Sequence, residues 1–313
     1  MRIFLAGATG AIGRHLVPQL INAGHRVTAT THSESKVALL WNLGAEPVVV
    51  DGLDAAAIGD AVARAGPEVV IHQMTGLSAL TNLKHFDREF AETNRLRIEG
   101  LDHLLAAARA TGTRRIIAQS FTGWPNIRSG SAVKTEADPL DPSPPKEQRR
   151  SIAAIRHVEH TVVNSPLEGV VLRYGTFYGN GVAQQLFDAI TKRQLPIVGG
   201  GGATWSWIHI EDAAAATVAA VEHGSGIYNI VDDDPTPVRE MIPALAELLG
   251  AKPPRHVPVR LARVLAGDVG VSMLTQIRGS SNAKARRELG WAPHWTSWRD
   301  GVRHELETAV VAG

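Results

Sequence analysis

Short apolar runs and longer helical patterns follow one another regularly along this chain. A short apolar run indicates a buried strand, and apolar positions three or four residues apart indicate a helix. The expected strands are residues 2–6, 26–31, 46–50, 68–72, 114–119, 169–173 and 227–231, with the longest helical patterns at 82–110 and 146–164. Strands that alternate with helices form parallel sheets, so the pattern predicts an α/β protein with a doubly wound, Rossmann-type parallel sheet.

The first strand leads directly into a glycine-rich turn. Gly7, Gly10 and Gly13 are spaced three residues apart, and a helical pattern follows them. A helix that begins at such a turn offers free N–H groups and the positive end of its dipole to a phosphate. Strand, glycine turn, helix and strand together predict a dinucleotide-binding unit. The alternative is a glycine-rich turn that binds nothing.

The end of the second strand indicates which dinucleotide is preferred. A site for NAD usually has an acidic residue about 20 positions after the glycines. This chain has Thr31, His32 and Ser33 there instead, followed by Glu34 and Lys36. The first three side chains and the lysine suit a 2′-phosphate, and only Glu34 opposes one. We therefore expect NADP to be preferred to NAD as the cofactor.

Other strand ends complete the expected cofactor site, because ligands of open parallel sheets bind at the carboxyl edge. Asp51 follows the third strand and can accept a hydrogen bond from an adenine amino group. His72 ends the fourth strand, and we interpret it as a packed residue rather than a catalytic one. The residues expected to contact the cofactor are Gly7, Thr9, Gly10, Ala11, Ile12, Gly13, Thr31, His32, Ser33, Lys36, Asp51, Gly52, Leu53, Gln73, Met74, Thr75, Asn94, Ser120, Tyr174 and Gly175.

Composition and charge exclude several classes of protein. The chain has 32 Lys and Arg residues against 31 Asp and Glu, so it has no basic field for nucleic acid or an anionic membrane. It has no cysteine, which excludes disulfides, a thiol nucleophile and cysteine-ligated metal, and we expect no metal site. No apolar run approaches the roughly 20 residues of a membrane span. We expect a cytoplasmic protein without a signal peptide that acts on a small molecule.

Several motifs together resemble the extended short-chain dehydrogenase/reductases of the NAD-dependent epimerase/dehydratase family. GATGAIG is similar to the family's glycine motif, and the stretch from Asn94 through Gly100 and Leu101 to Arg115 is similar to its asparagine-bearing helix. VVLRYGTFYGNG resembles its Arg-x-x-x-x-Tyr-Gly turn, and WIHIEDAA, IYNIVDDDP and SSNAKARRELGWAP resemble its later signatures. The resemblance covers nearly the whole chain.

The resemblance implies a domain organisation and an oligomeric state. A Rossmann domain would contain residues 1–173, with 205–233 returning to it. A smaller, mostly helical substrate lobe would contain residues 174–204 and 234–313. A homodimer would pack through the two long helices that begin near residues 82 and 146.

The family's catalytic pair is absent from this chain. Members use Tyr-x-x-x-Lys with a Ser or Thr: the lysine bonds the nicotinamide ribose and lowers the tyrosine pKa, and the tyrosine exchanges a proton with the substrate. The three tyrosines are Tyr174, Tyr178 and Tyr228, and none has a lysine four residues later. The family's chemistry therefore cannot be carried over unchanged.

Two alignments of this region are open. An alignment on the proline-rich DPSPP places Lys146 at the tyrosine position and Arg150 at the lysine position. An alignment on Glu159 places Ser151 and Ile155 there instead. We favour the first, in which Arg150 holds the ribose, and Lys146 or a water held by Ser120 or Thr122 supplies the proton. The alternative is that these cations only begin a solvated helix.

Residues beyond the sheet edge are expected to form the substrate site. Ser120 and Thr122 are possible donors to a substrate oxygen, with Thr122 preferred. Residues 125–145, which contain five prolines, are expected to form a lid, with a solvated linker as the alternative. His209 and Asp212 are expected to brace the lobe, with Arg173 as their ionic partner. Further side chains expected at the substrate are Trp124, Tyr178, Trp205 and Arg278, whereas Trp291, Trp295 and Trp298 are expected in the lobe core.

Three functions are open at this point. The favoured one is an NADP-linked oxidoreductase that acts on a small carbonyl or alcohol with an atypical proton donor. The second is a nucleotide-sugar epimerase or dehydratase that recycles bound NAD. The third is a dinucleotide-sensing binder that resembles the NmrA-like regulators. The missing catalytic pair supports the third function, and the full-length substrate lobe opposes it.

Overall fold

A parallel sheet of seven strands forms the centre of the computed structural model, which describes residues 1–76 and 82–312. The strands stand in the order β12-β7-β5-β4-β1-β2-β3. Their bounds are β1 (Arg2–Ala6), β2 (Arg26–Thr31), β3 (Glu46–Val49), β4 (Val69–His72), β5 (Arg115–Phe121), β7 (Glu168–Tyr174) and β12 (Gly226–Ile230). The chain moves outward from β1 first in one direction and then in the other, which defines a doubly wound sheet. The predicted fold class is confirmed.

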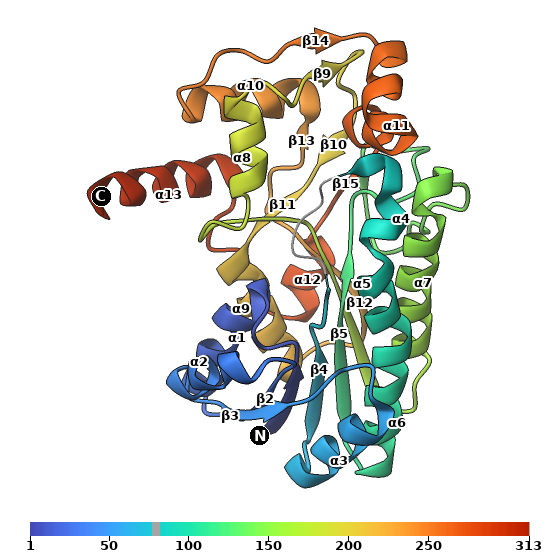
Figure 1. Cartoon of the computed structure of the whole chain (residues 1–313), viewed down its shortest axis with the longest axis vertical. Helices are drawn as coiled ribbons and strands as arrows, with labels where there is room; N and C mark the ends of the chain where they lie inside the picture. The colour runs from blue at the N-terminus through green and yellow to red at the C-terminus, as the bar shows by residue number, and fades with distance from the viewer. Residues whose placement is uncertain (77–81, 313) are drawn as a thin grey trace.

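Helices cover both faces of the sheet (Figure 1). One side carries α1 (Ala11–Asn22), α2 (Val37–Asn42) and α9 (Ile210–Glu222), and the other carries α3 (Ala55–Ala65), α6 (Leu101–Ala110) and α7 (Arg149–Val163). Sequence explains these helix limits. For example, Asp54 accepts a hydrogen bond from the backbone of Ala57 and caps α3, while Gly66 ends that helix in the left-handed conformation. Both apolar faces of the sheet are thereby buried.

The helix expected over residues 82–110 is interrupted. It consists of η2 (Leu83–His85), α4 (Phe86–Glu89), α5 (Ala91–Arg95), a π-helical turn η3 (Leu96–Gly100) and α6. The break between α4 and α5 falls at Phe90, and α7 is preceded by a short turn, η4 (Lys146–Gln148). A π-helical turn inside an α-helix is rare and frequently lies at a functional site.

A second group of elements lies above the sheet in Figure 1. It contains β8 (Thr176–Tyr178), α8 (Gln184–Thr191), β9 (Ile197–Val198), β10 (Thr204–Trp205), β11 (Trp207–His209), β13 (Thr236–Pro237), α10 (Val238–Leu248), β14 (His256–Val257), α11 (Val259–Thr275), β15 (Gly279–Ser280) and α13 (Trp298–Ala312). Its core includes Trp207, Met241 and the buried Trp298. None of the described helices is both long and apolar enough to cross a bilayer.

One C-terminal segment packs outside this core. In α12 (Ala283–Glu288), Ala285 is buried together with Leu289 and Trp291 in the core that covers the sheet, next to β12. The expectation that Trp291 lies in the lobe core is therefore corrected. Trp298 does lie there, and Trp295 packs against it.

Residues 125–145 form a packed connection. Within them, β6 (Val133–Lys134) pairs in parallel with β15. Arg128 forms an ion pair with Asp141 and donates a 2.8 Å hydrogen bond from Nε to Ser272 Oγ. These contacts tie the segment to the C-terminal elements. The expected lid is wrong, because no residue of 125–145 lines the cavity described below, and these contacts also exclude a solvated linker.

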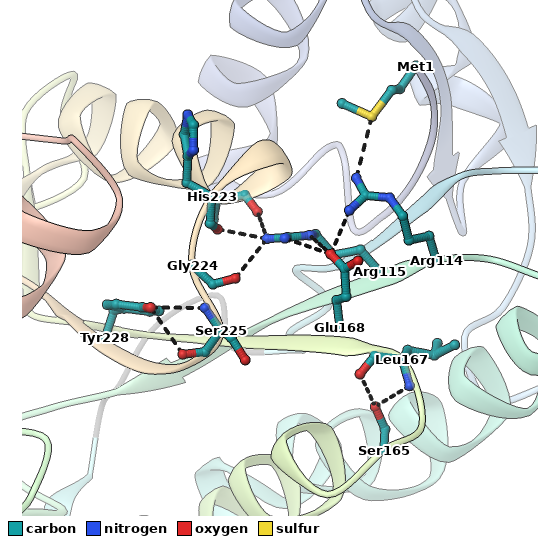
Figure 2. Close-up of polar contacts among 11 residues, drawn as sticks. Met1, Arg114, Arg115, Ser165, Leu167, Glu168, His223, Gly224, Ser225 and Tyr228 are labelled. Atoms are coloured by element: carbon teal, nitrogen blue, oxygen red, sulfur yellow. Dashed lines mark hydrogen bonds and ion pairs between the residues drawn. The ribbon is translucent and has the colours of Figure 1, made fainter.

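The opposite, amino end of the sheet is held by the buried Arg115 (Figure 2). Its Nη1 donates to the carbonyl oxygens of His223 and Gly224 at 2.7 and 3.1 Å, just beyond the end of α9. Its Nε and Nη2 donate to Glu168 at 3.1 and 2.7 Å. A cation favours the negative end of a helix dipole, so Arg115 stabilises α9 from the end of the sheet that is remote from the ligand edge.

Candidate active site

The glycine turn lies at the carboxyl edge of β1 and needs its glycines. Gly7 has φ +90°, and a Cβ there would lie 2.6 Å from the backbone of Gln73. A Cβ at Gly13 would lie 2.3 Å from the carbonyl oxygen of Ala8, so this glycine lets α1 lie close against the turn that precedes it. No side chain caps the start of α1 at Gly10, which leaves its N–H groups free for an anion.

An outer groove of about 420 Å³ runs along the turn and the ends of β2, β3 and β4. Carboxylates also line it, at Asp51 and Glu92. The predicted cofactor residues that line this groove are Gly7, Thr9, Gly10, Thr31, His32, Lys36, Asp51, Gly52, Gln73, Met74 and Thr75. The sequence pattern thus brings most of the predicted set to one surface.

An inner cavity of about 440 Å³ adjoins the groove and shares Gly10, Gln73 and Thr75 with it. Predicted residues that line only this cavity are Ala11, Ile12, Ser120, Thr122, Trp124, Tyr174 and Trp205. The two hollows together extend from the glycine turn to the C-terminal elements, where Trp205, Met273 and Ile277 line the inner cavity.

Five predicted cofactor residues line neither hollow: Gly13, Ser33, Leu53, Asn94 and Gly175. Gly13 and Gly175 face backbone instead, since a Cβ at Gly175 would lie 2.8 Å from the carbonyl of Ser206. Asn94 turns toward α7, where its Nδ2 donates a 3.0 Å hydrogen bond to Ser151 Oγ. These residues support the site from outside it.

Aromatic side chains form one wall of the inner cavity. The rings of Phe86 and Phe90 are stacked with centroids 4.4 Å apart. Trp124 meets Phe86 edge-on at 5.0 Å and Phe121 at 5.9 Å. Sequence reasoning found Trp124 but missed the other three. Phe86, Phe90, Thr93 and Arg97 recur at helical spacing on one face, a pattern that could have revealed them.

Two residues predicted at the substrate lie elsewhere. Tyr178 is completely buried and packs edge-on against Trp207 and His209, and burial raises the pKa of its phenol. Arg278 donates from Nε to the carbonyl oxygen of Arg128 at 2.8 Å. Neither lines the inner cavity. Both predictions are corrected, because these side chains pack and form hydrogen bonds within the lobe instead.

The hydroxyl groups of Ser120 and Thr122 line the inner cavity and are already bonded. Ser120 Oγ donates to Glu159 Oε1 at 2.8 Å. Thr122 Oγ1 donates to Asn126 Oδ1 at 3.1 Å and lies 2.5 Å from Ser280 Oγ. The Ser120 hydroxyl therefore presents its oxygen lone pairs, rather than a free proton, to a ligand.

Arg173 pairs with Glu159, which corrects its expected pairing with Asp212. Its Nε and Nη2 donate to the two carboxylate oxygens at 2.7 and 2.6 Å. Asp212 instead accepts backbone hydrogen bonds from His294 and Trp295 at 2.9 and 3.0 Å. His209 Nε2 lies 3.2 Å from Glu305 Oε1. His209 and Asp212 thus bind the C-terminal segment, as expected of residues that brace the lobe.

Helix α7 decides between the two alignments of the missing catalytic pair. Ser151, Ile155 and Glu159 lie four residues apart on its buried face, whereas Lys146 and Arg150 are exposed and line neither hollow. Ser151 Oγ donates to Asp87 Oδ1 at 2.6 Å. The structure contradicts the alignment that placed Lys146 and Arg150 at the reacting groups, because Arg150 is on the exposed face of α7 and Lys146 is exposed in η4, which precedes it. The alignment that places Ser151 and Ile155 there agrees with the buried face of α7.

Ionisable groups are scarce in the inner cavity. Arg97 is the one charged side chain among its lining residues in the described part of the chain. Tyr174 Oη accepts from Gln73 Nε2 at 2.9 Å and contacts Thr217 Oγ1 at 2.7 Å, and burial raises the pKa of Tyr174 to about 12. His72 is buried with its Nε2 2.9 Å from the Leu96 carbonyl, and burial lowers its pKa. It lines neither hollow, which fits a packed residue.

Comparisons with known proteins agree with this geometry. A model of the NAD dependent epimerase/dehydratase family matches residues 3–231. A 3-diazoavenalumate denitrifying reductase from a Streptomyces species is 41% identical over 97% of this chain and 100% of its own. A 4-hydroxy-2-methyl-3-oxo-4-farnesyl-3,4-dihydroquinoline-1-oxide ketoreductase from Stigmatella aurantiaca is 27% identical over 93% of this chain and 92% of its own.

Solved structures show the same fold. A UDP-glucose 4-epimerase from Thermotoga maritima, solved with UDP-glucose, matches with a TM-score of 0.77 and 23% identity, covering 100% of this chain and 99% of its own. A UDP-glucose 4-epimerase from Thermus thermophilus, solved with NAD, matches with a TM-score of 0.73 and 22% identity over 100% of both chains. The chain belongs to the NAD dependent epimerase/dehydratase family and is an NAD(P)-dependent oxidoreductase or epimerase of the extended short-chain type.

Proposed function

We propose that this chain is an NADPH-dependent reductase that transfers hydride to an aromatic substrate in the inner cavity. The observation that carries the proposal is the cavity itself, which begins at the free end of α1 and is walled by Phe86, Phe90, Phe121 and Trp124. The outer groove would hold the adenine half of the dinucleotide, and the inner cavity the nicotinamide with the substrate. When bound, the cofactor supplies the hydride.

Three side chains that line the outer groove support a preference for NADPH over NADH. Thr31, His32 and Lys36 line the groove near the end of β2, where a 2′-phosphate would lie, and Glu34 is exposed and does not. Lys36→Ala is expected to weaken NADPH binding about 10-fold, from the loss of one charged hydrogen bond, and to leave NADH binding unchanged. Equal losses for both dinucleotides would contradict the preference.

The absence of a proton donor at the family's catalytic positions limits which chemical groups can accept the hydride. Hydride added to a neutral carbonyl produces an alkoxide, which needs a proton. Hydride added to the terminal nitrogen of an aryl diazonium ion produces a neutral diazene, which then loses N₂ and leaves the arene. Hydride addition to the diazonium ion neutralises its positive charge, so this step needs no proton donor. Ser151 and Ile155 supply none at the family's positions, and the relative at 41% identity is named for a denitrifying reduction of a diazo compound.

Carbonyl reduction is the second candidate. The ketoreductase relative supports it. The hydroxyl groups of Ser120 and Thr122 line the cavity wall, but they already donate to Glu159 and Asn126, so each would have to turn its proton toward a substrate oxygen. A nucleotide-sugar substrate receives less support, since Arg97 is the one cation among the residues that line the inner cavity in the described chain, and a diphosphate needs several.

The two candidates separate in one experiment. Purified protein is mixed under anaerobic conditions with NADPH and either a carboxylate-bearing benzenediazonium salt or the matching aryl methyl ketone. The proposal expects one N₂ released for each NADPH oxidised with the diazonium salt, above the rate without protein. Enzyme-dependent oxidation of NADPH by the ketone alone would favour the second candidate, and no oxidation with either would contradict both.

Three coarser expectations are part of the same proposal. We infer a homodimer that packs through α6 and α7, which lie side by side on the outside of the molecule and are joined by His157 Nε2 and Asp102 Oδ1 at 2.9 Å. Light scattering would detect the dimer. Limited proteolysis would test the domain limits after residues 173, 204 and 233, and cell fractionation would test a cytoplasmic location.

A further inference from the structure

Arg97 is a buried cation that has no counter-ion among the described residues. Its side chain is 5% exposed and lines the inner cavity. Its Nη1 makes one long hydrogen bond of 3.4 Å to Asn94 Oδ1, and its guanidinium carbon lies 5.7 Å from the centroid of the Phe90 ring. Its Nε is buried and has no acceptor among the described residues. Residues 77–81 are Leu, Ser, Ala, Leu and Thr, so they add no carboxylate either.

Such an arrangement is unfavourable in the protein alone. A buried charge normally has a carboxylate partner, and an unpaired donor loses its bonds to water without replacement. Burial lowers the pKa of Arg97 to about 10, so the group still carries its charge at neutral pH. A ligand in the cavity would supply the favourable interaction that the described residues do not make with Arg97.

The position of Arg97 limits what that ligand is. It lies in the π-helical turn η3, on the same face as Phe86, Phe90 and Thr93, which also line the cavity. A guanidinium is a planar fork of donors that matches the two oxygens of a carboxylate. A flat ring held between the aromatic wall and the sheet edge would carry such a group to it.

We propose that Arg97 is the receptor for a carboxylate on the substrate, so that the natural substrate is an aromatic acid. This inference rests on the proposed function for its occupant, because it assigns the inner cavity to the substrate. The diphosphate of the dinucleotide is the competing anion. It would bind at the start of α1, where Gly10, Ala11 and Ile12 lie.

The test measures binding and needs no turnover. Dissociation constants of cinnamate and cinnamamide, two probes that differ only in charge, are measured by calorimetry with and without NADP⁺. The wild-type protein is expected to bind cinnamate more tightly, and Arg97→Met to weaken cinnamate about 10- to 100-fold while leaving cinnamamide and NADPH unchanged. Arg97→Met should also fold, since it removes an unpaired buried charge.

Arg95→Met is the matched control. Arg95 lies two residues away, is exposed and pairs with Glu99 at 2.8 Å, so its loss should leave both dissociation constants unchanged. The inference is overturned if wild type binds the two probes equally or binds cinnamate not at all. It is also overturned if Arg97→Met weakens NADPH but keeps the preference for cinnamate. Absence of N₂ release with an unchanged binding pattern would instead contradict only the proposed reaction.

Discussion

Asn94 donates a hydrogen bond of 3.0 Å from Nδ2 to the hydroxyl oxygen of Ser151. This contact joins α5 to the buried face of α7. Ser151 in turn donates to Asp87, so three elements meet at one serine. Ser151 therefore has a structural role in the region where the resemblance to the family led us to look for catalytic groups.

Lys146 and Arg150 should be dispensable for turnover. Lys146 is exposed in η4 and Arg150 in the first turn of α7, and neither side chain lines the groove or the cavity. We expect Lys146→Ala and Arg150→Ala to retain kcat/KM within about twofold, because exposed surface substitutions seldom change more than ~0.5 kcal/mol. Steady-state kinetics with NADPH checks this. A loss of two orders of magnitude in either variant would restore the alignment that the structure contradicts.

Glu159 should be essential for stability. Its carboxylate holds the buried Arg173 at 2.6 and 2.7 Å and accepts from Ser120. Glu159→Gln leaves the guanidinium without a counter-ion and is expected to lower the free energy of unfolding by about 3–5 kcal/mol. Urea denaturation measures this change. Ser120→Ala is the control, with an expected loss of about 1 kcal/mol, and equal losses in the two variants would contradict the ion pair's role.

Gly7 should be required both for folding and for the cofactor. A Cβ at this position would lie 2.6 Å from the backbone of Gln73, and the residue also has φ +90°. Gly24 has a similar φ of +81°, but a Cβ added there would meet nothing within 4 Å, so Gly24→Ala isolates the backbone strain. We expect Gly24→Ala to lose about 1 kcal/mol and to bind NADPH normally.

For Gly7→Ala we expect a larger loss of stability than for Gly24→Ala, together with loss of measurable NADPH binding. Thermal unfolding and calorimetry on the two variants provide the comparison. Normal NADPH binding by Gly7→Ala would show that the turn does not cradle the dinucleotide.

Asp232 should make the protein less stable as pH rises. Its side chain is 1% exposed, and burial, the largest cause, raises its pKa to about 8. The unfolded chain releases this proton near pH 4, whereas the folded chain keeps it, so the folded state binds more protons between these values. The free energy of unfolding therefore falls with pH across this window, by up to about 1.4 kcal/mol per unit.

Asp232→Asn removes this dependence. The difference in unfolding free energy, wild type minus variant, should fall steadily from pH 5 to pH 8 in denaturant titrations. Other groups titrate in both proteins and cancel in the difference. A constant difference would show that Asp232 ionises normally in the folded state.

The sheet was predictable because its central strands, such as β1 and β4, are short, largely apolar runs that are buried on both faces. The glycine turn was equally clear, since Gly7 and Gly13 are needed by backbone contacts that few other residues could make. The cavity wall was harder to predict. Phe86, Phe90 and Arg97 belong to an interrupted helix. Their spacing marks a common face, but the packing of α4, α5 and η3 beside α7 is what places that face on the cavity.

Tertiary competition explains the wrong predictions. Tyr178 and Arg278 have side chains suited to a substrate, but the lobe core and the carbonyl of Arg128 engage them. Arg173 was given Asp212 as a partner on sequence grounds, although Glu159 lies on the helix that packs beside β7. In each case the side chain makes polar or packing contacts that suit its type, but the partner is decided by the packing of elements that are far apart in the sequence.

Single-turnover oxidation of bound NADPH tests the central claim most directly. Protein and NADPH are mixed in equal amounts, and a carboxylate-bearing benzenediazonium salt or the matching aryl ketone is added while nicotinamide fluorescence is followed. The account predicts that the fluorescence decays in the wild-type protein with one of these two acceptors, faster than in protein-free solution. Fluorescence that persists with both acceptors, despite saturating concentrations, would contradict hydride transfer in this cavity.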